Sequence, residues 1–294
     1  MKDTLINLDK TPINSPFRYA GGKFYARKII GSYIPEHKYY VEPFVGGGSI
    51  FFYKDKVSSW INDSDQELIN CYKVIRDDVE ELIYALKGEN ATKERHHYYK
   101  NEFNPKSKFE SAVRYYYLNR TSYSGIMKHE NCYFGYGDKY SMRPENWGRQ
   151  LMKNHTKLKN VKITSWDFEK VINKMNSKDA FLFVDPPYYN ADQNKFYKNF
   201  FALDDHARLS EVLKKYSNKM NFLLTYDNSP EVKEMYSWAK KMDAQEWNYT
   251  ISRTDDQKNK LKLKDGFSKK RKKGKEIFIF NYKVSIPKQL EINI

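Results

Sequence analysis

The sharpest chemical signal in the sequence is the tetrapeptide Asp185-Pro186-Pro187-Tyr188. The apolar stretch Ala180–Val184 comes directly before it and is predicted to be a buried strand. Proline has no backbone N–H, so a double-proline turn after a strand presents a carboxylate and a carbonyl oxygen as acceptors. Two acceptors can hold both protons of an exocyclic amino group, and the tyrosine ring can stack on a planar base. The alternative is a surface turn with a capping aspartate.

A second signal is a glycine-rich segment at residues 41–48, Val-Glu-Pro-Phe-Val-Gly-Gly-Gly. It ends a predicted strand, Lys38–Phe44, and precedes a predicted helix, Ser49–Lys54. Glycines at such a place let the backbone approach a ligand closely. The spacing is not that of the dinucleotide fingerprint G-x-G-x-x-G, which speaks against a nicotinamide oxidoreductase.

Asp63 follows the next predicted strand, Val57–Ile61. An acid at that place can accept hydrogen bonds from the ribose hydroxyls of an adenosine-containing cofactor. Equally, it can cap the predicted helix Asp65–Arg76.

A third signal is the segment Phe-Arg-Tyr-Ala-Gly-Gly-Lys at residues 17–23. It combines an aromatic side chain, a flexible turn and a cation ahead of the first predicted strand. Such a segment can contact a phosphate, or it can simply lead into a helix over Phe24–Ile30.

Strand-like and helix-like patterns alternate along most of the chain, which predicts an α/β fold. Downstream of Asp185 they predict a helix over Asp204–Tyr216 with Asp204 as its N-cap, a strand over Asn221–Tyr226, and a helix opened by Ser229-Pro230. Residues 79–159 differ, because they are polar, aromatic and mostly helical, as over Lys108–Leu118. We therefore expect a core formed by 1–78 and 160–294, with an insertion at 79–159.

Composition narrows the class of protein. The chain has 294 residues, with 52 Lys and Arg against 37 Asp and Glu, and a formal net charge of +15. A basic surplus favours polyanionic partners, although an AT-rich genome also inflates lysine. No apolar run is long enough to cross a membrane, the first residues do not resemble a signal peptide, and two cysteines cannot build a disulfide framework. We expect a cytoplasmic protein without membrane contacts.

The basic residues concentrate in Lys258–Lys275, which lies between two predicted strands, Gln245–Ser252 and Glu276–Val284. This arrangement predicts a long hairpin loop that touches phosphate, or alternatively a solvated loop without that role. Its candidate DNA contacts are Lys269, Lys270 and Arg271.

In this order, the segments 17–23, 41–48 and 185–188 resemble the DNA adenine-N6 methyltransferases of the Dam type, the D12 class, in the group alpha arrangement. The resemblance runs through most of the chain. It implies a Rossmann-like S-adenosylmethionine-dependent methyltransferase core with a mostly helical target-recognition insertion. It also implies S-adenosylmethionine as cofactor, S-adenosylhomocysteine as product, no metal, and double-stranded DNA as partner in a bacterium or a phage-infected cell.

The resemblance also assigns roles to residues. The catalytic turn would consist of Asp185, Pro186 and Tyr188. The short Trp166-Asp167-Phe168 element resembles one that flanks the cofactor adenine, although Asp167 can equally cap a helix over Phe168–Met175. The cofactor-binding residues would be Tyr19, Lys23, Glu42, Phe44, Gly46, Gly48, Asp63, Asp167, Phe168 and Asp185.

The insertion resembles the family less closely. The stretch Tyr117–Ile126 is similar to a region of GATC-specific members, but Ser124 stands where they usually have asparagine, and residues 133–137 also depart from their pattern. Base-edge contacts set specificity, so these departures speak against GATC. Candidate DNA contacts are Arg120, Tyr123, Ser124, Lys128 and Arg143, each of which can instead be a surface charge or an aromatic core residue.

The implied reaction is methyl transfer to the N6 amine of an adenine flipped out of the duplex. Transfer to N4 of cytosine, to RNA adenine or to a protein glutamine would use a related turn. A DNA-binding protein without activity is an alternative from another class. The setting would be restriction-modification, with a cognate restriction endonuclease as a further partner, or modification of phage or host DNA.

Overall fold

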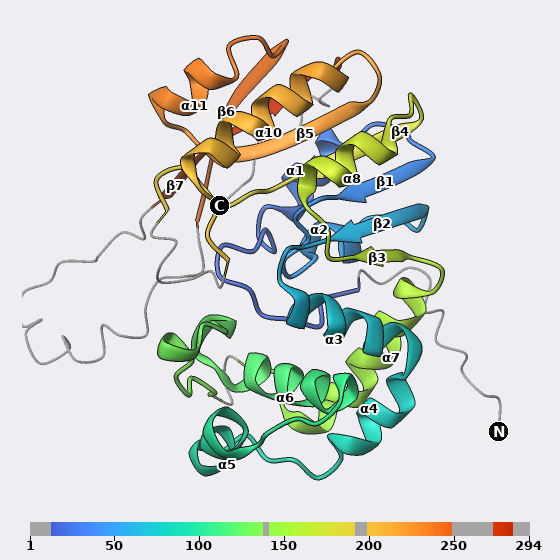
Figure 1. The fold of residues 1–294 in the computed structure, drawn as a ribbon, viewed down its shortest axis with the longest axis vertical. Coiled ribbons are helices and arrows are strands. Elements are labelled where there is room, and N and C mark those ends of the chain that lie inside the picture. Colours follow the sequence, from blue (N-terminus) through green and yellow to red (C-terminus); the bar gives the residue numbers. More distant parts are fainter. Residues whose placement is uncertain (1–12, 138–140, 192–198, 249–272, 285–294) are drawn as a thin grey trace, which may run out of the picture.

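The structure, a computed structural model, describes residues 13–137, 141–191, 199–248 and 273–284 (Figure 1). These residues form a seven-stranded sheet in the order β3-β2-β1-β4-β5-β7-β6. The strands are β1 (Tyr39–Glu42), β2 (Ser58–Asn62), β3 (Lys162–Thr164), β4 (Ala180–Val184), β5 (Asn221–Asp227), β6 (Lys241–Asn248) and β7 (Lys273–Phe280).

The topology places two of the chemically interesting segments side by side. Strands β1 to β5 pair in parallel, whereas β7 lies antiparallel between β5 and β6. The strand order reverses between β1 and β4, which are direct neighbours. In open α/β sheets a ligand binds beyond the carboxyl ends of the strands at such a reversal. The segments after β1 and β4 are the glycine-rich segment and the Asp185 turn.

Both faces of the sheet are buried. Side chains alternate between the faces of a strand, so Phe181 and Phe183 join one apolar cluster while Leu182 and Val184 join the other. The first cluster includes side chains of α1 (Arg27–Tyr33), α2 (Ser49–Tyr53) and α3 (Gln66–Asp77), and the second those of α8 (Phe168–Met175), α10 (Leu203–Tyr216) and α11 (Pro230–Met235). The result is a Rossmann-like α/β core.

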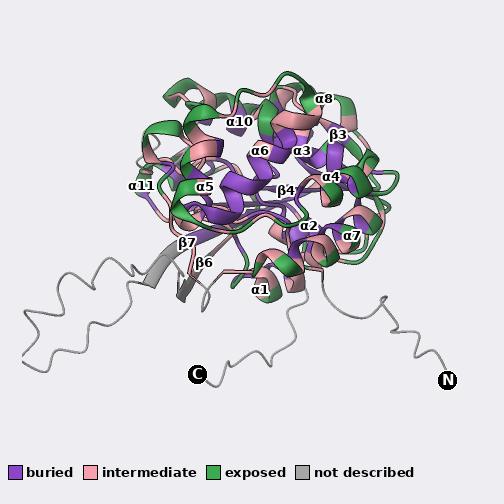
Figure 2. Cartoon of the chain, turned by 90° about the horizontal axis from the view of Figure 1, so that it is seen from below, coloured by how far each residue is buried: buried purple, intermediate pink, exposed green. Residues whose placement is uncertain are grey.

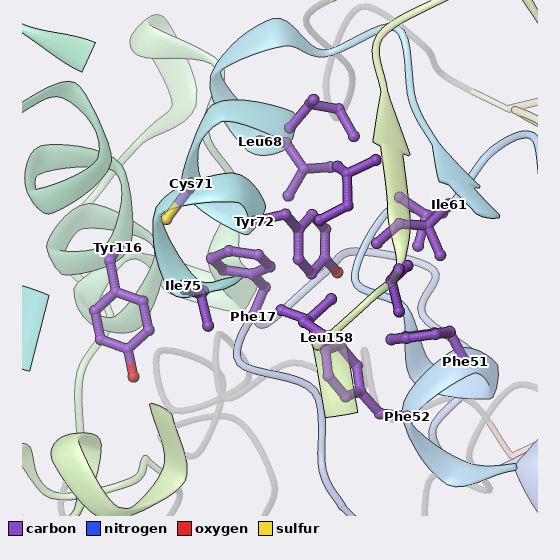
Figure 3. Close-up of a cluster of buried hydrophobic side chains, with 14 of the residues drawn as sticks. Phe17, Phe51, Phe52, Ile61, Leu68, Cys71, Tyr72, Ile75, Tyr116 and Leu158 are labelled. Atoms are coloured by element: carbon purple, nitrogen blue, oxygen red, sulfur yellow. The ribbon is translucent and has the colours of Figure 1, made fainter. Parts of the chain in front are cut away.

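A mostly helical part comes between β2 and β3 in the chain and lies beyond β3 in Figure 1. It packs on the core through α3, whose Cys71 and Tyr72 are fully buried. Figure 3 shows Phe17 beside Tyr72, with ring centroids 4.8 Å apart, and Tyr116 on the neighbouring helix α6 (Lys108–Thr121). The elements of this mostly helical part are α4 (Val79–Ala85), α5 (Lys93–His97), a π-helical turn (Tyr98–Glu102), α6 (Lys108–Thr121), three short 3-10 turns (Tyr123–Gly125, His129–Asn131, Pro144–Asn146) and α7 (Trp147–Leu158).

Burial follows this layered arrangement. Figure 2 shows buried residues along the strands and the inner helices, and exposed residues on the outer surfaces of the helices. Within the described ranges, no helix has both the length and the apolar character that a membrane crossing needs.

Most expected elements are confirmed, and one expected cap is wrong. Asp65 caps α3 by accepting from the amides of Glu67 and Leu68, and Ser229 caps α11. Asp204, expected to cap the helix that ends at Tyr216, does not, because α10 begins one residue earlier. Its N-cap is Ala202, whose amide donates to the Asp205 carboxylate at 2.9 Å. Strands β6 and β7 pair as the arms of a hairpin, and residues 249–272 between them lie outside the described residues.

Candidate active site

Asp185 stands directly after β4 and is held by the distant Lys23. The Lys23 Nζ lies 2.7 Å from Oδ1 and 2.8 Å from Oδ2 of Asp185, so the ammonium contacts both oxygens. The same Nζ donates to the Gly21 carbonyl at 3.2 Å. The Lys23 side chain is only 4% exposed, against 20% for Asp185. The ion pair is therefore largely desolvated, with the Asp185 side closer to solvent.

Thr225, on the adjacent strand β5, makes a second contact with this carboxylate. Its Oγ1 donates a 2.7 Å hydrogen bond to Asp185 Oδ1. The parallel pairing of Val184 with Leu224 brings the next residue of each strand together. Sequence reasoning missed Thr225, although a polar residue near the end of an apolar strand was the available signal.

Tyr188 lies in the same turn. Its ring centroid is 4.9 Å from the Lys23 Nζ and 6.0 Å from the Tyr226 ring. Asp227 at the end of β5 braces the turn by accepting from the Tyr189 amide at 2.8 Å and from the Asn190 side chain at 3.0 Å. The structure thus brings Lys23, Asp185 and Tyr188 together.

Asp63 accepts a hydrogen bond from the backbone of the glycine-rich segment. Its Oδ2 accepts from the Gly46 amide at 2.9 Å, and its Oδ1 accepts from the Asp65 amide at 3.0 Å. Burial raises the pKa of Asp63 to about 6, against the effect of these hydrogen bonds. Because Asp65 is the residue that caps α3, the capping interpretation of Asp63 is wrong.

Tyr19 packs on the glycine-rich segment. Gly46 and Gly48 have φ angles of 46° and 68°, in the left-handed region that favours glycine. A Cβ on Gly46 would lie 3.0 Å from the Tyr19 ring, and one on Gly47 would lie 2.8 Å from the Tyr19 Cβ. Glycine is therefore required here for steric reasons, and the segment forms a close-fitting backbone cradle.

Glu42 ends β1 in a fully buried position. The Tyr40 hydroxyl donates to its Oε1 at 2.6 Å. Burial, helped by the nearby Asp185 carboxylate, raises the pKa of Glu42 to about 8 against the lowering effect of the Tyr40 hydrogen bond. Glu42 therefore carries a proton for much of the time near neutral pH.

Phe44 and Phe168 come together although they are far apart in the sequence. Their ring centroids are 5.4 Å apart, and Phe201 packs against both. Asp167 accepts from the Glu169 amide at 2.9 Å as the N-cap of α8 and pairs with Arg208 at 2.8 Å. The helix-capping interpretation of Asp167 is thus confirmed, and its carboxylate remains 47% exposed.

The candidate DNA contacts of the insertion are spread over the segment from the end of α6 to the start of α7. Arg120 is only 6% exposed, and its guanidinium donates to the Pro16 carbonyl at 3.5 Å. Tyr123, Ser124 and Lys128 are half-buried, and Arg143 is exposed. Lys269, Lys270 and Arg271 lie outside the described residues.

Two further buried polar residues near the site were not predicted from the sequence. Asn119 is fully buried and bonds to the backbone of the segment that carries Tyr19. Glu276, only 1% exposed, begins the run Glu-Ile-Phe-Ile-Phe on β7. An acid at the start of an apolar strand was visible in the sequence, but the side chains that surround it depend on the order of the strands in the sheet.

Comparison with known proteins agrees with this geometry. The chain is 29% identical over 248 residues to the type II methyltransferase M1.LlaDCHI of Lactococcus lactis subsp. cremoris, covering 78% of this chain and 87% of that protein. It is 29% identical over 230 residues to the type II methyltransferase M.MjaIII of Methanocaldococcus jannaschii, covering 68% and 79%. It is 27% identical over 261 residues to the DNA adenine methylase of Vibrio cholerae serotype O1, covering 83% and 92%.

The chain also matches a whole protein family, as well as these single relatives. Residues 19–251 match the D12 class N6 adenine-specific DNA methyltransferases. The match begins at Tyr19 and includes the cradle, residues 79–159 and the Asp185 turn. With most of its length matched, the chain belongs to the D12 class of N6 adenine-specific DNA methyltransferases.

Proposed function

We propose that this adenine-N6 DNA methyltransferase uses S-adenosylmethionine to methylate an adenine flipped out of duplex DNA, with Asp185, Pro186 and Tyr188 as the catalytic turn. The observation that carries the proposal is the placement of this turn on β4, beside the glycine cradle on β1. An acceptor turn and a cradle on adjacent strand ends can bring an amino group and a methyl donor together.

The Asp185 carboxylate and the Pro186 carbonyl would accept the two protons of the adenine amino group. Accepting both protons leaves the nitrogen lone pair free to point at an electrophile. Thr225 orients the carboxylate, and Asp227 fixes the backbone that follows Tyr188. The Tyr188 ring would stack on the flipped base. Rate enhancement would come from positioning and electrostatics, and the proton would leave after the nitrogen becomes cationic.

The cradle fits a nucleoside cofactor. Asp63 is built into it through Gly46, Tyr19 packs against it, and Phe44 and Phe168 form an apolar wall near the end of β1. Of these, Asp63 would hold the ribose, and Tyr19 and Lys23 would contact the rest of the cofactor. When bound, S-adenosylmethionine would supply the methyl group on a sulfonium. Glu42, Gly48, Asp167 and Asp185 complete the proposed cofactor set.

We further propose that the insertion at 79–159 carries target recognition, and that the core consists of 1–78 and 160–294. The excess of basic residues over the whole chain, +15, supports binding to the phosphates of double-stranded DNA. Arg143 is the exposed candidate of the insertion, whereas Arg120 is placed to support the loop around Pro16. The type II methyltransferases among the relatives favour a restriction-modification setting with a cognate endonuclease in the cytoplasm.

The test is a methyl-transfer assay. The protein is incubated with S-adenosylmethionine and unmethylated genomic DNA, the DNA is digested to nucleosides, and the product is identified by mass spectrometry. We expect N6-methyladenine from the wild type and none from Asp185→Ala, with DNA binding largely retained. Asp179→Ala is the matched control, because Asp179 is an exposed acid at the opposite end of β4. N4-methylcytosine, or full activity of Asp185→Ala, would overturn the proposal. Long-read mapping of the same DNA gives the recognition sequence.

A further inference from the structure

Glu276 is a buried carboxylate near the carboxyl ends of β4 and β5, and the proposed reaction assigns no role to it. Strand β7 runs antiparallel to β5, so it passes this edge near its beginning, whereas the parallel strands reach it at their ends. The pairing sets Glu276 opposite Asp227 on β5 and Gln245 on β6. Glu276 lies beyond the segment that matches the family, residues 19–251.

Four titratable side chains act on Glu276, and they come from the segment before α1, the turn after β4 and the end of β5. Burial raises its pKa to about 7, the Lys23 ammonium lowers it, and the Asp185 carboxylate raises it. The Tyr188 hydroxyl also lowers this pKa, and the Asp227 carboxylate raises it. Glu276, only 1% exposed and paired across the strands with Asp227, thus lies within electrostatic reach of Lys23, Asp185 and Tyr188.

The Lys23 ammonium competes with the proposed substrate. It contacts both oxygens of Asp185, and Thr225 already donates to Oδ1. A carboxylate oxygen can accept two hydrogen bonds, so Lys23 and Thr225 already fill Oδ1, and an adenine amino group that donates to Asp185 has to share Oδ2 with Lys23. An ammonium that is 4% exposed and has to share Asp185 in this way gains from a second carboxylate nearby, because a buried cation without a partner charge is costly.

We propose that Glu276 is a positioning residue that receives the Lys23 ammonium and orients the Tyr188 hydroxyl when Asp185 turns to the target amine. The inference rests on the proposed roles of Asp185 and Tyr188. In this arrangement a charged Glu276 frees Asp185 for the substrate, whereas a protonated Glu276 leaves Lys23 on Asp185. Methyl transfer should therefore depend on the ionisation of Glu276.

The test compares the wild type with Glu276→Gln, which keeps the shape and removes the charge. Single-turnover transfer to unmethylated genomic DNA is measured with saturating S-adenosylmethionine between about pH 5.5 and about pH 8.5. We expect Glu276→Gln to be about tenfold slower at the alkaline end and nearly equal to the wild type at the acid end. The affinity for S-adenosylmethionine should change little. Glu211→Gln, an exposed acid on α10, is the control for the loss of one charge.

Each outcome decides the inference. Equal rates and equal pH profiles for the wild type and Glu276→Gln would overturn it, and so would a uniform loss at every pH. If thermal melting shows that Glu276→Gln is unfolded, Glu276→Asp decides instead. That variant keeps the charge and should retain the alkaline rise in rate, and a flat profile would overturn the inference. A wild type that makes no N6-methyladenine would refute the proposed function, whereas an active wild type separates the two questions.

Discussion

Asn119 on α6 and Arg18 in the segment before α1 are joined by two reciprocal hydrogen bonds. The Arg18 amide donates to Asn119 Oδ1 at 2.9 Å, and Asn119 Nδ2 donates to the Arg18 carbonyl at 2.9 Å. Asn119 is fully buried and also donates to the Gly125 carbonyl at 3.3 Å. One side chain therefore ties the segment that carries Tyr19 and Lys23 to the last turn of α6 and the loop that follows it.

Asn119→Ala should weaken both stability and cofactor binding. The change removes these hydrogen bonds and leaves buried backbone groups unpaired, at a cost of about 2–3 kcal/mol. Tyr19 follows Arg18 directly, so the affinity for S-adenosylmethionine should fall as well. Thermal melting and calorimetric titration measure the two effects. Asn101→Ala, at an exposed site on the π-helical turn, is the control, and equal behaviour of the two variants would contradict the coupling.

Thr225→Val should slow methyl transfer with little change in stability. Valine has nearly the same shape as threonine but lacks the hydroxyl that orients Asp185 at 2.7 Å. We expect a loss of about tenfold in the single-turnover rate, as for one orienting hydrogen bond. Thr225→Ser retains a hydroxyl and should recover most of the rate. A valine variant as fast as the wild type would show that Thr225 does not orient the carboxylate.

Gly46→Ala should weaken cofactor binding through steric strain. Alanine at a φ of 46° costs about 1–2 kcal/mol, and its Cβ would lie 3.0 Å from the Tyr19 ring. We expect the dissociation constant for S-adenosylmethionine to rise at least about tenfold. Gly137→Ala is the matched control, because nothing lies within 4 Å of a Cβ at that position. Similar affinities for the two variants would argue against a cradle at Gly46.

The contribution of Glu42 to stability should fall as the pH rises, and Glu42→Gln should remove that contribution. The Glu42 pKa is about 8 in the folded chain, above the unfolded value of about 4.3. Between these values the folded state holds a proton that the unfolded state releases, so the Glu42 contribution to stability declines from about pH 5 to about pH 8 and then levels off. Asp63 and Glu276, with pKa values of about 6 and about 7, act in the same direction.

Thermal melting without cofactor at about pH 5.5 and about pH 8.5 measures this effect. The difference between the two melting temperatures should be smaller for Glu42→Gln than for the wild type. Glu211→Gln, at an exposed position, should leave the difference unchanged. A Glu42→Gln variant with the wild-type difference would show that Glu42 is ionised throughout this range.

The sequence by itself determined the local elements and the chemical motifs. The strand Ala180–Val184 was predicted with the bounds that the structure shows, because a short apolar run bounded by polar residues is a local pattern. The same holds for the Asp185 turn, which depends on two prolines, and for the cap of α11 at Ser229. Membership in the methyltransferase family followed from the order of three such local motifs.

Only the tertiary structure decided what surrounds the Asp185 carboxylate. Lys23 reaches it from 162 residues away and Thr225 from 40 residues away. Glu276 arrives there because β7 inserts antiparallel between β5 and β6. The burial of Arg120, which a charged residue in a polar segment does not suggest, is decided in the same way. Strand order and burial arise from contacts between distant segments, and periodicity within a segment carries no information about its partners.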